Sequence, residues 1–382
     1  MVSLLGTKDK IDLFMQSGVL DSLTKLFKNS ADDNIKIEVT KVFIELCNSS
    51  ADCSRELSNR GVTILAREEL IKRTRGVKLL SDFVVELLKL IRSILESDDE
   101  LIGIDFGKNT FIKSILVCLV SGKRLAKIEA ACCLCGIFLK FSKLDYDSST
   151  FITLIDSLKK AIEEQDDELA ALCLGAASYY GRYRKHFDFL RNLNGFMGIV
   201  LNCIGVEPIA VDKKFFAKYC QSPVIHLIKQ LSDSPLQQEK FTNEGLFISI
   251  VSALQSELPE TRADALELIT SYISKSSDTS TLTMILRHIL PLLSDKDERV
   301  LLKGAKCLHT MAIIPELINP IVDGQGVNAL MNMLTSPRKD LVAAAGNAIA
   351  QLMESESARD VFVKSDGLLL IFSFIVSILK TL

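Results

Sequence analysis

Apolar residues recur along this chain with the spacing of an α-helix. Near the start they fall at i, i+4, i+7, i+8 and i+11, at Ile35, Val39, Val42, Phe43 and Leu46. Near the end the same offsets return at Leu341, Ala345, Ala348, Ile349 and Leu352. Each set forms one apolar stripe along a helix of 3.6 residues per turn. The pattern therefore predicts a long amphipathic helix in both places.

A glycine and a shorter apolar helix precede each long helix. The short helix before Leu341 has one apolar face, made by Val327, Leu330, Met331 and Leu334. The glycine recurs at Gly18, Gly61, Gly107, Gly195, Gly245, Gly326 and Gly367. Two further phases, near Phe151 and Ile285, keep the helices without the glycine. Gly18 and Gly367 are eight steps apart, so the repeat is about 44 residues long.

These repeated segments resemble armadillo repeats. The stretches TNEGLFISIVSAL from Thr242 and VKSDGLLLIFSFI from Val363 resemble the start of the family's second helix. EAACCLCGIFL from Glu129 and VAAAGNAIAQL from Val342 resemble its third helix. The stretch HILPLLSDKDERVLLKGAKCL from His288 is similar to the related HEAT unit. The resemblance covers nearly the whole chain, and it implies an architecture more strongly than a function.

We expect an all-α, right-handed superhelical solenoid of armadillo or HEAT type with about eight to nine units. One such unit cannot bury its stripe alone, so neighbouring units stack. The prediction is a single array over residues 1–382. Its approximate units are 1–50, 51–96, 97–143, 144–185, 186–232, 233–277, 278–316, 317–356 and 357–382, the last incomplete or capping. Residues 205–216 and 274–281 are expected to be loops.

Composition narrows the class of protein. Hydrophobic residues make up 48% of the chain, which suits a large core, and the net charge of −3 argues against a general nucleic-acid binder. No secretory signal is visible, and the ten cysteines show no paired spacing, so an intracellular protein with free thiols is expected. We predict a cytoplasmic location, with the nucleus as an additional one. The apolar run 368–379 is too short to span a membrane and predicts a buried helix.

The stretch YYGRYRKHF, residues 179–187, interleaves aromatic and basic side chains. Such a pattern can bind nucleic acid or a protein partner. In the helical register above, the aromatic residues face inward and Arg182, Arg184 and Lys185 point to solvent. Packing between units is therefore the favoured interpretation. A partner contact through these three basic residues is the next alternative, and nucleic-acid binding, together with the basic segment 72–78, is the least favoured.

No sequence motif indicates catalysis. ACCLCG, residues 131–136, lacks the second ligand pair of a zinc site, and buried thiols explain it better. DGQGVNA, residues 323–329, matches a dinucleotide fingerprint but falls in the turn between helices, with no strand before it. We expect no enzyme activity, no cofactor, no metal site and no small-molecule substrate.

The resemblance also implies a concave groove lined by the third helices, which in import receptors and catenins carries a row of asparagines. The corresponding positions here are Glu45, Gly136, Ala176, Thr310 and Gln351. Asn347 stands where the import receptors have a tryptophan, and this chain has no tryptophan at all. The chemistry for reading basic nuclear-localisation peptides is therefore missing. Glu45, Gln351 and Asn347 are the expected polar contacts in the groove.

The function that this pattern favours is a non-catalytic scaffold or adaptor that binds a protein or peptide, mainly in the concave groove. The alternative is a regulatory or autoinhibitory armadillo region of a longer protein, suggested by the unfinished last unit. The identity of the partner, the pathway and the oligomeric state do not follow from the sequence.

Overall fold

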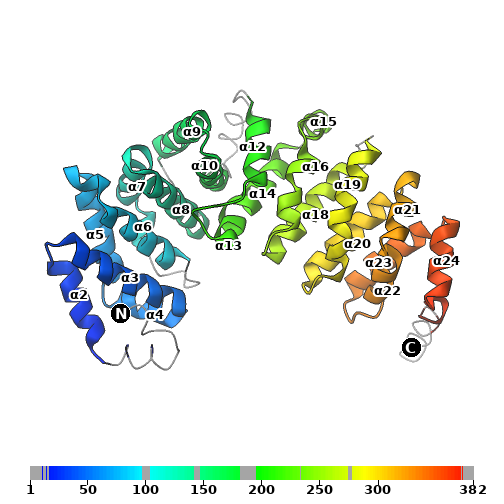
Figure 1. The fold of residues 1–382 in the computed structure, drawn as a ribbon, viewed down its shortest axis with the longest axis horizontal. Helices are drawn as coiled ribbons and strands as arrows, with labels where there is room; N and C mark the ends of the chain where they lie inside the picture. The colour runs from blue at the N-terminus through cyan, green and yellow to red at the C-terminus, as the bar shows by residue number, and fades with distance from the viewer. Residues whose placement is uncertain are drawn as a thin grey trace. The chain divides into compact units, whose positions relative to one another are not determined.

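The computed structural model describes residues 17–96, 104–141, 147–180, 195–232, 234–273 and 278–370, with residues 11, 14 and 372. All regular elements in these ranges are helical, so the predicted all-α class is confirmed (Figure 1). The chain forms two compact units. One comprises residues 1–190 and 208–211, and the other comprises residues 191–207 and 212–382.

The first unit is a stack of helices in which every repeat ends with a helix that packs on those of its neighbours. The long helices α3, α6, α8 and α10 pack in chain order, and α2, α5, α7 and α9 pack on them. The helices are α2 (Val19–Asn29), α3 (Asp33–Ser49), α4 (Ala51–Asn59), α5 (Val62–Thr74), α6 (Asp82–Leu95), α7 (Asn109–Ser121), α8 (Arg124–Lys140), α9 (Ser148–Glu163) and α10 (Asp167–Tyr180), with 3-10 turns η2 (Val77–Leu80) and η3 (Ile104–Gly107).

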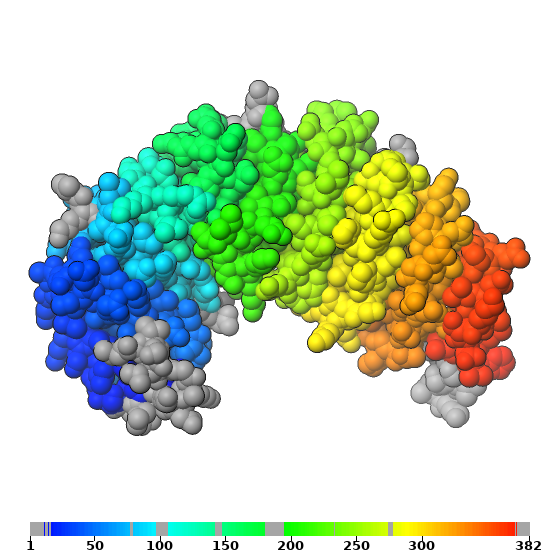
Figure 2. Space-filling view, viewed as in Figure 1, coloured from blue at the N-terminus to red at the C-terminus, as the bar shows by residue number. Residues whose placement is uncertain are grey.

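The second unit repeats this arrangement with α14, α18, α20 and α23 as its consecutive long helices, which follow one another in chain order (Figure 2). The elements are α12 (Phe196–Gly205), α13 (Lys213–Phe216), η4 (Ala217–Gln221, a π-helix), α14 (Ser222–Leu231), α15 (Pro235–Asn243), α16 (Leu246–Ser249), α17 (Val251–Leu254), α18 (Pro259–Ile273), α19 (Thr279–Ile289), η5 (Leu290–Ser294), α20 (Glu298–Met311), α21 (Pro315–Asp323), α22 (Gly326–Met333), α23 (Lys339–Leu352) and α24 (Glu356–Lys364).

The predicted apolar stripes form the core. In α3 the stripe from Val39 to Leu46 is buried, but Ile35 in the first turn is 39% exposed, so its assignment to the stripe was wrong. In α23 all five predicted positions are buried. The loop predicted at 205–216 ends early because Asp212 caps α13 from Lys213 onward. Of the loop predicted at 274–281, residues 274–277 lie outside the described ranges, and Thr279 already begins α19.

The repeated glycines have two different structural causes. Gly18, Gly61, Gly195 and Gly245 have positive φ angles and directly precede α2, α5, α12 and α16, where a left-handed residue redirects the chain. In the last two phases the left-handed residue is instead the one before the glycine, Gln325 at φ 62° and Asp366 at φ 59°. Gly367 is needed there for close packing, since a Cβ would lie 2.6 Å from the ring of Phe362.

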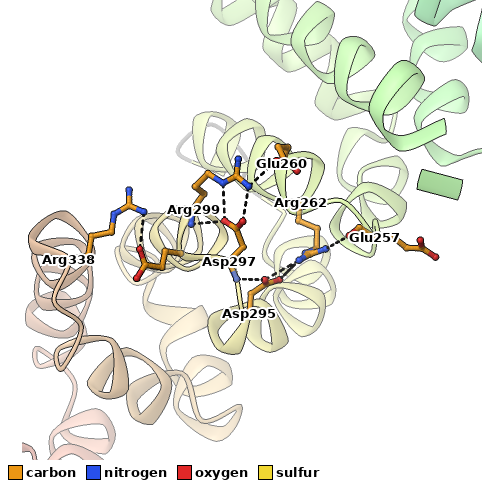
Figure 3. A network of polar contacts seen from close by, with 8 residues as sticks. Glu257, Glu260, Arg262, Asp295, Asp297, Arg299 and Arg338 are labelled. Atoms are coloured by element: carbon orange, nitrogen blue, oxygen red, sulfur yellow. Dashed lines mark hydrogen bonds and ion pairs between the residues drawn. The ribbon is translucent and has the colours of Figure 1, made fainter. Parts of the chain in front are cut away.

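A buried arginine ties consecutive repeats of the second unit together (Figure 3). Arg262 of α18 donates to both carboxylate oxygens of Asp295, at 2.8 and 3.0 Å, in the turn before α20. It also donates to the carbonyl oxygens of Ser256 and Glu257, at 2.7 and 3.1 Å. The side chains of Arg262 and Asp295 are only 15% and 9% exposed. A bidentate, desolvated pair of this kind fixes the geometry of both turns.

More exposed ion pairs follow the same junctions. Arg299 of α20 donates to Asp297, at 2.7 Å, and to Glu260 of α18, at 2.9 Å. Arg338, just before α23, lies 3.6 Å from Glu298 of α20. Because solvent screens such pairs, they orient neighbouring helices more than they stabilise them. The pairs Arg299–Glu260 and Arg338–Glu298 join the starts of neighbouring long helices, so α18, α20 and α23 run parallel.

Replacing Arg262 by Ala should lower the free energy of unfolding by about 3 kcal/mol, because Asp295 is left as a buried carboxylate without its cation. Arg359→Ala is the matched control. Arg359 makes the same two carbonyl contacts, to Met353 at 2.8 Å and Glu354 at 3.1 Å, but it is exposed and has no buried carboxylate to neutralise. Its loss should cost about 0.5 kcal/mol. Urea denaturation measures both, and equal losses would contradict the role given to Asp295.

The Asp297 carboxylate should make stability depend on pH. Hydrogen bonds from Arg299 lower the pKa of Asp297 from 3.8 to about 2. A carboxyl group whose pKa is lower in the folded state stabilises above its unfolded pKa, and this contribution disappears as the pH falls from about 4 to 2. We expect Asp297→Asn, which keeps a helix cap, to cost about 1 kcal/mol at pH 7 after allowance for solvent screening. The difference from the parent should vanish near pH 2 in urea titrations.

Candidate protein-interaction surface on helix α23

The predicted site residues are distributed over both units. Glu45 is exposed on α3 of the first unit. Asn347 is exposed and Gln351 half-buried on α23 of the second unit. Arg182, Arg184 and Lys185 lie outside the described residues. Two positions that the resemblance aligns with the family's asparagine row, Gly136 and Ala176, are buried. A Cβ on Gly136 would lie 3.2 Å from Leu95 of α6, so this position packs against the neighbouring helix.

Helix α10 of the first unit offers little open surface. Its residues from Glu168 to Tyr179 are buried. The carboxylate of Glu168, only 4% exposed, accepts hydrogen bonds from the backbone amides of Ile209, Ala210 and Val211 at 3.0, 2.8 and 3.1 Å. Three amide donors on one carboxylate form a stable anchor for the segment 208–211. The first turn of α10 is therefore occupied by the chain itself.

The charged side chains between α6 and α8 neutralise one another. Arg92 donates to Glu129 at 2.8 Å, and Lys89 donates to Glu86 at 2.8 Å. Burial raises the pKa of the Glu129 carboxyl, and the Arg92 guanidinium opposes that rise. In the predicted basic segment 72–78, Arg73 is only 7% exposed and donates to Asp33 and Glu69. These charges serve the internal packing of the first unit.

Helix α23 of the second unit is different, because one side of it lines a cavity of about 890 Å³. Val342, Gly346 and Ala350 of α23, here called the floor, line it together with Phe362 of α24 and Leu370. Asn347, predicted from the sequence, is part of the lining, and Gln351 is not. Small residues keep the floor flat, so another backbone can approach it closely.

Three polar side chains line this cavity, those of Ser336, Lys339 and Asn347. The Ser336 hydroxyl accepts a hydrogen bond from the backbone N–H of Arg338 at 3.2 Å. Lys339, the first residue of α23, is exposed, and its ammonium makes no ion pair or hydrogen bond with any residue that the structure describes. The backbone carbonyl of Asn347 lies 3.2 Å from Nδ1 of His309, while its side-chain amide is exposed. Sequence reasoning missed Lys339. The sequence did carry a signal for it, because α23 begins with the positively charged Lys339 whereas α20 begins with the negatively charged Glu298.

The cysteines and the glycine-rich segment considered in the sequence do not line this cavity. All ten cysteines are buried and free of disulfides. In the described ranges no group of three or more His, Cys, Asp or Glu side chains is placed to hold a metal ion. The glycine-rich segment 323–329 connects α21 to α22, so the strand that a dinucleotide site needs is not before it. Within the same ranges, no helix is long and apolar enough to cross a membrane.

Comparison with known proteins supports the fold alone. No protein-family model matches the chain, and no curated protein is similar to it. The crystal structure of an engineered protein aligns with 97% of this chain and 88% of its own, with a TM-score of 0.55 at 17% identity. A second engineered protein aligns with 88% of this chain and 96% of its own, at 14% identity and a TM-score of 0.37. The first similarity agrees with an all-helical, repeat-like architecture.

The buried thiols should be almost inert in the native protein. Burial raises the pKa of Cys47, Cys118, Cys173 and Cys307 to about 12, so the reactive thiolate is scarce at pH 8. We expect a disulfide reagent to modify native thiols more than about a hundredfold more slowly than free cysteine, and to modify all ten thiols in urea. Rapid modification of one thiol in the native state would reveal an opening that the packing does not show.

Proposed function

We propose that this chain is a non-catalytic scaffold or adaptor of armadillo type that binds a protein partner on the surface of its long helices. The observation that carries the proposal is the cavity beside Asn347, which lies on the outward side of a helix and has a largely apolar floor. An apolar surface with a few polar groups at its edge is the usual composition of an interface centre and its rim.

A protein partner suits this cavity better than a small molecule. Its floor is one side of a single regular helix, and that side is already used for helix packing elsewhere in the unit. Its described lining includes no histidine, cysteine, aspartate or glutamate, and no group of side chains placed to hold a metal ion. The polar groups there are a hydroxyl, an amide and an ammonium, which suit hydrogen bonding and charge pairing with a polypeptide.

The proposal is tested by quantitative capture of proteins from a native extract with three baits. The parent is compared with Ala343→Glu, which places a charge in the exposed lining of the cavity, and with Ile313→Glu, which makes the same change at a position 59% exposed outside it. We expect a defined set of proteins to bind the parent and the Ile313 variant and to fall at least about tenfold with the Ala343 variant, because a desolvated charge opposes binding. Equal capture by all three baits, or no specific capture by the parent, would contradict the proposal.

A further inference from the structure

The long helices of the second unit repeat with a fixed correspondence between their residues. The buried stripes of α18, α20 and α23 begin at Thr261, Val300 and Leu341 and share the offsets +4, +7, +8 and +11 from these residues. Every residue of α20 therefore has an equivalent 41 positions later on α23. This correspondence shows what should cover each side of a long helix.

The side of α20 that faces the next repeat is closed. Ala305, Leu308 and Ala312 are at most 1% exposed, and α23 is the next long helix packed on α20. The equivalent residues of α23 are Gly346, Ile349 and Met353, which all line the cavity. A Cβ added to Gly346 would meet only one side-chain atom, of Leu334, at 4.0 Å. Among the residues that the structure describes, the cavity thus occupies the place of a further long helix.

The charged residues beside the cavity indicate which charge a helix bound there would carry in its first turn. In the junction between α20 and α23, Glu298 at the start of α20 faces Arg338 at the start of α23. The equivalent of Glu298 is Lys339, which has the opposite charge. The neighbouring Asp340 is paired with Arg338, at 2.7 Å, so the charge left without a partner among the described residues is positive. An acidic residue at the start of the incoming helix would pair with Lys339 and would also be favoured by the helix dipole.

We propose that the open side of α23 binds an amphipathic helix of another protein, parallel to α23, with an acidic first turn against Lys339 and an apolar stripe over Gly346. This rests on the proposed scaffold function and adds the chemistry of the partner. Helix α23 has 14 residues, so the contact extends over about 20 Å, or four turns. The mode is helix-in-groove recognition, in which apolar anchors supply affinity and charge supplies direction.

A segment of this chain provides the probe. A peptide of residues 295–312 carries Asp297 and Glu298 in front of the α20 stripe, and a Cys307→Ser change prevents its oxidation. Fluorescence anisotropy of the labelled peptide with the full chain should give a Kd of about 10–100 μM. Lys339→Glu should weaken binding at least about tenfold, and a peptide with Asp297→Lys and Glu298→Lys should restore it for that variant alone.

Two further variants make the site specific. Gly346→Leu fills the floor and should abolish binding, while Lys240→Glu, at an exposed position of α15 outside the cavity, should leave the Kd within about twofold of the parent. Circular dichroism melting confirms that each variant is folded. The charge-swap rescue stands even where Gly346→Leu fails to fold, because Lys339 lies on the surface.

Three outcomes would overturn the inference. These are no binding up to 1 mM peptide, binding insensitive to Lys339→Glu, and concentration-dependent dimers in analytical ultracentrifugation that disappear with Lys339→Glu. The last outcome would assign the surface to a second copy of this chain. If the peptide does not bind but Ala343→Glu still reduces protein capture, the scaffold proposal is supported and only the inference of a helical partner is contradicted. If the peptide binds as expected but no cellular protein depends on Ala343, the scaffold proposal falls instead.

Discussion

The burial of each long helix by the next is the constraint on which the two units depend. A stripe such as Leu341, Ala345 and Ala348 is too narrow to form a core by itself, and it becomes one only because α20 packs alongside. The shorter helices then have a fixed task, which is to close the side of the stripe that the long helices leave open. This explains why short-helix lengths vary widely while the offsets within the long helices do not.

Ion pairs fix the register between neighbouring long helices, which apolar contacts alone would leave ambiguous. Equal stripes on successive helices could slide by one turn without losing much buried area. The Arg262–Asp295 pair prevents such a slide, because its bidentate geometry and its low exposure penalise any shift. In the first unit Arg73 does the same for α3 and α5 by bonding to Asp33 and Glu69. Specificity of register is a recognised use of buried polar groups, and it fits a repeat whose apolar sequence is nearly uniform.

The sequence predicted helices better than it predicted faces. Periodicity identified both long-helix stripes apart from Ile35. Gly136 and Ala176, aligned with the family's groove positions by resemblance, are buried because α8 and α10 are apolar on nearly every side, so no polar face marks where neighbours end. In α23 the polar residues Lys339, Asp340 and Asn347 supply that mark, and Asn347 was found. Lys339 was not predicted, because its charge stands out only when it is compared with Glu298, the equivalent residue of the preceding repeat.

Gly346 is the residue that internal packing does not explain. A glycine inside a helix costs about 0.5–1 kcal/mol relative to alanine, and proteins accept this where a neighbour needs the space of the Cβ. At Gly304 of α20 the neighbour is visible, since a Cβ would lie 3.0 Å from Leu293. At Gly346 a Cβ would meet only ordinary contact at 4.0 Å, in a helix that otherwise uses alanine at three consecutive positions before it. Stability of the described unit would favour alanine there as well. Among the described residues nothing needs the space of a Cβ at Gly346, and a second backbone that approached this point of α23 would account for the glycine. The apolar floor and Lys339, which has no ion pair within the described ranges, are the features that such a helix would contact.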